Sequence, residues 1–156
     1  MAYRGQFDRL IRAEERGQSI LSTRTIAVFD DGLVVCEVGV YGDGPPPRGP
    51  FGGRPGKRAV RRGAGPGRGD ERIREQAERA SSAVAFAEMW PRALLVPEAV
   101  IDRVVLTRPR QVAELTIYEE ADGPARSAFL GELSAGQVRA ALSPLLGERL
   151  RIEVEE

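Results

Sequence analysis

Residues 20–41 have the sequence ILSTRTIAVFDDGLVVCEVGVY, which predicts a β-hairpin. Apolar and β-branched residues fill both halves, and Asp30-Asp31-Gly32 separates them, with a glycine where a tight turn needs one. We expect strands over 20–30 and 33–41, the second richer in valine and better buried. The apolar residues of the first strand alternate between two faces: Ile26 and Val28 on one, Ala27 and Phe29 on the other.

Further strands are expected in the second half of the chain, where short apolar runs alternate with polar residues and end at Pro or Gly. The alternation places Glu114, Thr116 and Tyr118 on one face of their strand and Leu115 and Ile117 on the other. A strand-like tail follows at Leu150, Ile152 and Val154 and would form an edge strand. The expected strands of this half are 93–96, 101–107, 112–119, 126–133 and the tail.

Two helices of ordinary length are predicted by apolar residues at helical spacing. The first covers 70–89, and the second covers 134–146. The second has a capping box, with Ser134 as N-cap and Gln137 at the third helical position, and Gly147 fits its end. Both helices would pack against the sheet.

A short helix is also predicted at the N-terminus, over residues 6–16. Phe7, Leu10 and Ile11 are spaced as neighbours on one helical face, and Gly17 fits the helix end. We therefore expect an α+β fold: a bent antiparallel sheet or small barrel of six to seven strands, with two packed helices and this N-terminal helix. The length of 156 residues favours a single domain, 1–156.

The segment 42–69 interrupts this domain and differs from the rest in composition. Ten of its residues are Gly and six are Pro, so it offers little apolar surface to bury and we expect it to be flexible. Its seven basic residues oppose one acid, Asp43, which gives the segment a charge of +6 and leaves −6 on the rest of a neutral chain. These candidate contacts for a polyanion or partner are Arg48, Arg54, Lys57, Arg58, Arg61, Arg62 and Arg68.

The residue inventory argues against catalysis. The chain contains no His, which excludes Ser–His and Cys–His pairs and histidine metal ligands, and its one cysteine, Cys36, is expected to be a buried small hydrophobe. Gly56-Lys57 resembles the end of a phosphate-binding loop motif, but Arg58 occupies the position where that motif has Ser or Thr. We expect no catalytic residue, no metal and no cofactor, and an enzyme of unrecognised class is the least favoured alternative.

The pattern from residue 92 to 146, together with 20–41, resembles bacterial pleckstrin-homology-like domains. The resemblance implies a bent barrel with a closing helix and a role in binding or assembly rather than catalysis. The chain departs from it in the helix and loop over 42–90 and in the tail after the last helix. The segments that carry it are Leu94-Leu95-Val96-Pro97, Ile101-Asp102-Arg103-Val104, Leu115-Thr116-Ile117-Tyr118, the Asp122-Gly123 turn, Phe129-Leu130-Gly131 and the helix 134–146.

The function predicted from the sequence is a non-enzymatic intracellular interaction module that binds a protein partner or an anionic surface. An alternative is a nucleic-acid accessory protein that uses the basic 42–69 loop. No signal-peptide core or membrane-length apolar run is present, so a cytoplasmic location is expected. Self-association between the basic loop and the acidic remainder of two copies also stays open.

Overall fold

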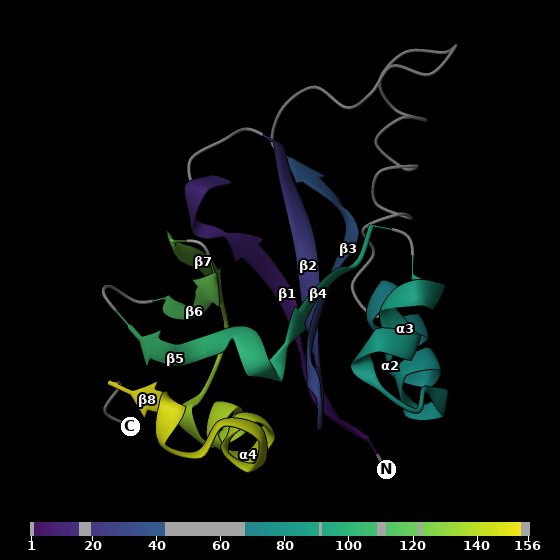
Figure 1. Ribbon diagram of the computed structural model, residues 1–156. Coiled ribbons are helices and arrows are strands. Elements are labelled where there is room, and N and C mark those ends of the chain that lie inside the picture. The colour runs from purple at the N-terminus through teal and green to yellow at the C-terminus, as the bar shows by residue number, and fades with distance from the viewer. Residues whose placement is uncertain are drawn as a thin grey trace.

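The computed structural model describes residues 2–15, 20–42, 68–90, 92–108, 112–121 and 123–153 and shows an α+β fold with one open sheet (Figure 1). The sheet has eight strands in the order β4-β3-β2-β1-β7-β6-β5-β8, and all neighbours are antiparallel except β5 and β8. The strands are β1 Tyr3–Arg12, β2 Ile20–Phe29, β3 Gly32–Gly42, β4 Leu94–Pro97, β5 Ile101–Thr107, β6 Ala113–Ala121, β7 Gly123–Gly131 and β8 Leu150–Ile152. The helices are α2 Arg68–Arg79, α3 Ala83–Met89 and α4 Ala135–Leu146, with short 3-10 turns η1 Ala13–Glu15, η2 Glu98–Val100 and η3 Gly147–Arg149.

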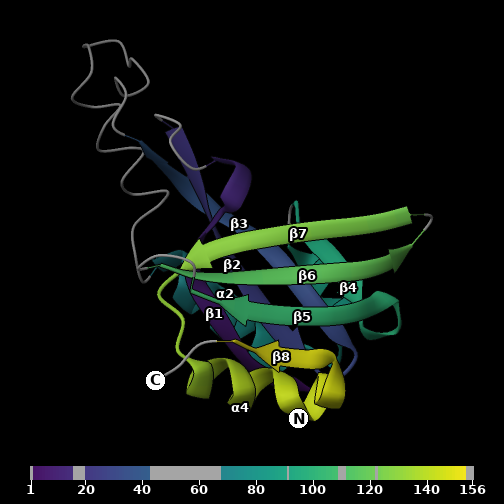
Figure 2. The same ribbon diagram turned by 90° about the vertical axis from the view of Figure 1, so that its left-hand side faces the viewer.

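Strand β1 divides the sheet into two halves because it changes its pairing partner along its length. Its residues from Tyr3 to Leu10 pair with β2, whereas Ile11 and Arg12 pair with β7. One half is therefore β4-β3-β2-β1, and the other is β7-β6-β5-β8. The second half is seen face-on in Figure 2, and the sheet bends between the halves.

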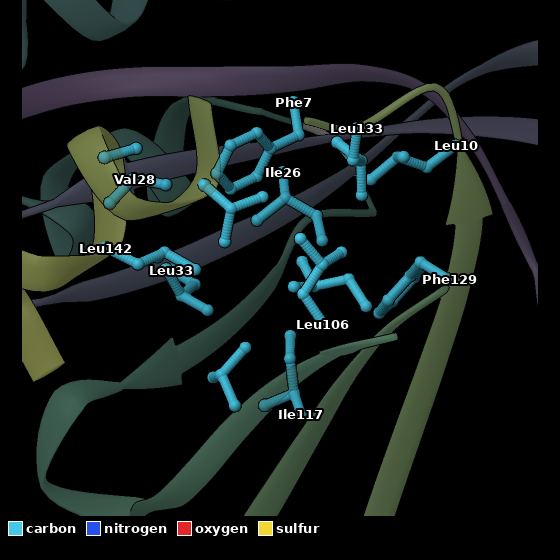
Figure 3. Packing of buried hydrophobic residues seen from close by; sticks show 14 of the residues in the cluster. Phe7, Leu10, Ile26, Val28, Leu33, Leu106, Ile117, Phe129, Leu133 and Leu142 are labelled. Carbon is cyan, nitrogen blue, oxygen red and sulfur yellow. The ribbon is translucent and has the colours of Figure 1, made fainter. Parts of the chain in front are cut away.

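The main core lies between the two halves and against α4. Figure 3 shows Phe7, Ile26 and Leu33 from the first half facing Leu106 and Phe129 from the second. A second cluster lies on the opposite face of the first half, where α2 and α3 cover it, and it contains Ala27, Phe29 and Cys36. Strands β2 and β3 are thus buried on both faces. The two-faced alternation predicted for the hairpin is confirmed.

The helix predicted over 6–16 is wrong, because residues 6–15 belong to strand β1 and the turn η1 and residue 16 lies outside the described part. The ladder with β2 pairs Phe7 with Ile26 and Leu10 with Arg24, so β1 has one extra residue between these pairs. The extra residue makes a β-bulge, in which Arg9 has a φ of 58°. The bulge lets Phe7 and Leu10, three residues apart, both reach the main core, and their spacing imitates that of a helix.

The single helix predicted over 70–89 is two helices, α2 and α3, with a break between them. Ser82 is the N-cap of α3, and its hydroxyl accepts a hydrogen bond from the Ala85 amide at 3.0 Å. The Asp31 carboxylate, from the hairpin turn, accepts another from the Ala83 amide at 2.8 Å. Restarting the helix buries Ala83 and leaves Val84 48% exposed, whereas a continuous helix would have placed Val84 inward.

The C-terminal elements agree with the sequence. Ser134 caps α4 by accepting a hydrogen bond from the Gln137 amide at 3.1 Å, and Gly147 ends the helix with a φ of 57°. Residues Leu150–Ile152 of the tail form the edge strand β8, whereas Val154 lies outside the described residues. The predicted six to seven strands become eight because β1 was missed, and the helices among the described residues are three, none of them at the N-terminus.

The Arg149 side chain forms hydrogen bonds to the corner where the chain passes from β4 to β5. Its guanidinium donates to the carbonyl oxygens of Glu98 and Ile101 at 3.2 and 2.9 Å and pairs with the Glu98 carboxylate. The same group donates to the carbonyl oxygens of Leu145 and Leu146, in the last turn of α4, at 3.3 and 3.4 Å. These carbonyls have no partner within the helix, so one side chain satisfies both the helix end and the corner.

Candidate binding surface on the outer face of the sheet

The basic residues singled out in the sequence fall almost entirely outside the described part of the chain. Arg68 opens α2, although its side chain is not described, and Gly42 ends β3. The 42–69 segment is therefore shorter than predicted at both ends. The six candidate residues outside the described part are Arg48, Arg54, Lys57, Arg58, Arg61 and Arg62.

Cys36 is placed as a core residue, as the sequence predicts. Its side chain is fully buried in the second cluster, between the sheet and the helices α2 and α3. Burial raises the pKa of the Cys36 thiol to about 12, because the charged thiolate loses its hydration there. Within the described ranges, no three Cys, Asp or Glu side chains gather as a metal-binding group.

Cys36 should consequently be unreactive in the folded protein. At pH 8 we expect a disulfide reagent such as dithionitrobenzoate to react at least about 100-fold more slowly with the native chain than with the chain in urea. The chain has one cysteine, so the released thionitrobenzoate reports this site alone. Equal rates in the two states would show that the second cluster is not packed as described.

The outer face of the second half of the sheet is the one broad sheet surface that none of the described helices covers (Figure 2). Leu115 and Ile117 point into the main core, so Thr116 and Tyr118 point outward. Cross-strand partners share a face, and Tyr118 is opposite Arg103 on β5 and opposite Arg126 on β7. Three neighbouring strands therefore present a row of two arginines with a tyrosine between them.

At the centre of the row, the side chains of Arg103 and Tyr118 are in contact. The guanidinium carbon of Arg103 lies 3.9 Å from the centroid of the Tyr118 ring, which is van der Waals contact with the ring face. Arg151 on β8 pairs with Val105, two residues after Arg103, and so shares the face. Arg126 and Arg151 are exposed. We name Arg103, Tyr118, Arg126 and Arg151 the arginine–tyrosine row.

Acidic groups limit the basic region to one end of the face. The Asp102 carboxylate accepts a hydrogen bond from Arg103 at 3.0 Å. Glu114, opposite Thr107, lies at the other end and accepts a hydrogen bond from the Thr116 hydroxyl at 3.4 Å. Glu153, two residues after Arg151 on the chain, is exposed and lies on this face at the same end as Glu114. The described side chains on the face thus combine three positive charges with three negative ones, and the arginines lie on the side of Tyr118.

The sequence analysis placed Tyr118 and Thr116 on one face of their strand, but it did not find the row. Arg103 and Tyr118 are 15 positions apart in the numbering, and their meeting depends on the β5–β6 register. That register contains a bulge between Ile101 and Arg103, which no local signal in the sequence announces. Long-range pairing of this kind cannot be read from composition or periodicity.

Comparisons with known proteins return no matching family model, no matching curated protein and no matching solved structure. Across the described ranges, no helix combines the length and the apolar character needed to cross a bilayer.

Proposed function

We propose that this protein is a non-enzymatic interaction module that binds an anionic partner through the outer face of β7-β6-β5-β8. Such a partner presents carboxylates or phosphates, as an acidic segment of a protein or another anionic surface does. The observation that carries the proposal is the arginine–tyrosine row on a face that the described helices leave uncovered.

The chemistry of the row supports an anionic ligand. Guanidinium groups bind carboxylates and phosphates through paired N–H donors, and stacking on Tyr118 reduces the entropy that Arg103 would lose on binding. The surface is a sheet face, so it suits an extended ligand better than an enclosed small molecule. Neighbouring positive charges also speed the encounter with an anion.

The resemblance to bacterial pleckstrin-homology-like domains remains part of this proposal. It is supported by the antiparallel run β5-β6-β7 followed directly by α4, which closes one end of the main core. Helices α2 and α3, between β3 and β4, and the strand β8 are departures from it. The cytoplasmic location and a contribution from the 42–69 loop also stay predictions.

Charge reversal tests the proposal. We expect the triple variant R103E/R126E/R151E to bind heparin and poly-glutamate at least about tenfold more weakly than the parent at low salt, because the row loses three cations and gains three anions. The affinity is measured by fluorescence anisotropy with labelled polyanions. All three side chains are partly or fully exposed, so the variant should fold.

A matched control separates the face from net charge. The variant R79E/R92E/R139E makes the same change in charge at exposed positions on α2, before β4 and on α4. We expect it to keep most of the affinity. Equal losses in the two triple variants would show that binding follows total charge, and the proposed face would then be wrong.

A further inference from the structure

We propose that the ligand of this face is single-stranded nucleic acid, laid across the strands with one base stacked on the Arg103–Tyr118 pair. This inference rests on the proposed function and names its ligand. It uses the arginine–tyrosine row and requires nothing from the 42–69 loop.

The first step concerns which parts of the Arg103 guanidinium a ligand can still contact. Its guanidinium carbon lies over the Tyr118 ring, 3.9 Å from the centroid, and one of its terminal nitrogens donates to Asp102 at 3.0 Å. The side chain is nevertheless 41% exposed. A carboxylate or phosphate binds a guanidinium along its edge, whereas a nucleobase binds the flat face. A base can therefore extend the stack without displacing Asp102.

The second step concerns the phosphates on either side of that base. Arg126 is opposite Tyr118 on β7, and Arg151 lies beyond β5 on β8. Three strand-to-strand steps separate β7 from β8, which is about 14 Å. A stacked single strand covers this distance with roughly four nucleotides at a rise of about 3.4 Å each. The row is thus long enough for phosphates on both sides of the stacked base.

The third step compares a single strand with anionic partners that have a wide surface, namely a membrane or a duplex. A membrane or a duplex would bring negative charge over the whole face, including Glu114 at the end opposite the row. A narrow single strand can follow the row and avoid Glu114 and Glu153, which lie together at that end. A sheet face of this width also cannot enter the major groove of a duplex, which admits a helix or a two-stranded ribbon. A single strand is therefore the anionic polymer that fits best.

The test compares ligands that differ only in their bases. The probes are a labelled eight-nucleotide single-stranded DNA, an abasic oligonucleotide of the same length and charge, and poly-glutamate, each titrated into the full chain. We expect the DNA to bind about tenfold more tightly than the abasic probe, in line with the contribution of one stacked base. Poly-glutamate should bind no better than the abasic probe.

The variant Arg103→Lys keeps the charge and removes the planar group. We expect it to lose the preference for DNA over the abasic probe and to keep the affinity for the abasic probe. Arg139→Lys on α4 is the control and should change neither affinity.

Each remaining outcome decides between the two proposals. Equal affinity of the parent chain for DNA and the abasic probe, or an unchanged preference in Arg103→Lys, overturns the inference. If R103E/R126E/R151E still weakens binding of every polyanion in that case, the proposed function stands and only the nucleic-acid inference fails. If poly-glutamate binds more tightly than the DNA, the ligand is an acidic protein segment. If no polyanion binds the parent chain, both proposals fail.

Discussion

Arg149→Met should lower the free energy of unfolding by about 3 kcal/mol. The guanidinium donates to four backbone carbonyls, two at the β4–β5 corner and two at the end of α4. Methionine fills the space but donates nothing, so the carbonyls lose a charged donor. Hydrogen bonds to charged groups contribute about 1.5–3 kcal/mol each when buried, and the total here is reduced because the side chain is 33% exposed.

Urea unfolding followed by Trp90 fluorescence and circular dichroism measures this effect. Arg149→Lys should recover less than half of the loss, because an ammonium group cannot reach carbonyls on two sides at once. Arg139→Met, at an exposed position on α4, should change stability by less than about 0.5 kcal/mol. A similar small effect for Arg149→Met would mean that the corner is held by the core alone.

Gly32→Ala should cost about 2–3 kcal/mol. A Cβ at this position would lie 2.6 Å from the Val96 carbonyl oxygen and 3.1 Å from the Pro97 Cα, both of them backbone atoms of β4. Neither can move aside as a flexible side chain could, so β4 must shift away from β3 and its ladder must weaken. The glycine is therefore needed for the close approach of β4 as well as for the hairpin turn.

Gly136→Ala is the matched control for this change. Nothing lies within 4 Å of a Cβ at Gly136, which is in the first turn of α4. Alanine is the better helix former, so we expect a gain of about 0.5–1 kcal/mol. Thermal unfolding of both variants should thus shift in opposite directions. A neutral Gly32→Ala would show that β4 is not held against β3 as described.

The parts of the fold that the sequence predicted correctly are those set by neighbouring residues. The β2–β3 hairpin depends on the Asp-Gly turn, and the start of α4 depends on Ser134 and Gln137, so short-range chemistry specifies both. The prediction for strand β1 failed because the bulge at Arg9 places Phe7 and Leu10, which have a helical spacing, on the same face of a strand. Nothing near these residues in the sequence distinguishes a bulged strand from a short helix.

The break between α2 and α3 shows a second kind of failure. The apolar stripe continues from Ile73 through Val84 at helical spacing, and it predicts one helix. Two contacts decide otherwise: the Ser82 cap, and the Asp31 carboxylate that reaches the Ala83 amide from 52 residues away. The first could have been predicted from the serine pair at 81–82, but the second depends on the tertiary fold.

The candidate site could be predicted only in part, for the same reason. The sequence placed Tyr118 on a face opposite Leu115 and Ile117, which is confirmed. It did not indicate that α4 would pack at the main core and leave the outer face of β5, β6 and β7 without a helix. It also drew attention to charge that is concentrated in sequence, at 42–69, whereas the arginines of the row come from three different strands.

The location of the ligand is measured by backbone amide chemical shifts during titration of the full, isotopically labelled chain with the eight-nucleotide DNA. We predict that the largest changes fall on β5, β6, β7 and β8, at Arg103, Tyr118, Arg126 and Arg151, while the amides of α2 and α3 hardly change. Shifts confined to residues 43–67, or centred on α2 and α3, would contradict binding at the outer face of the sheet.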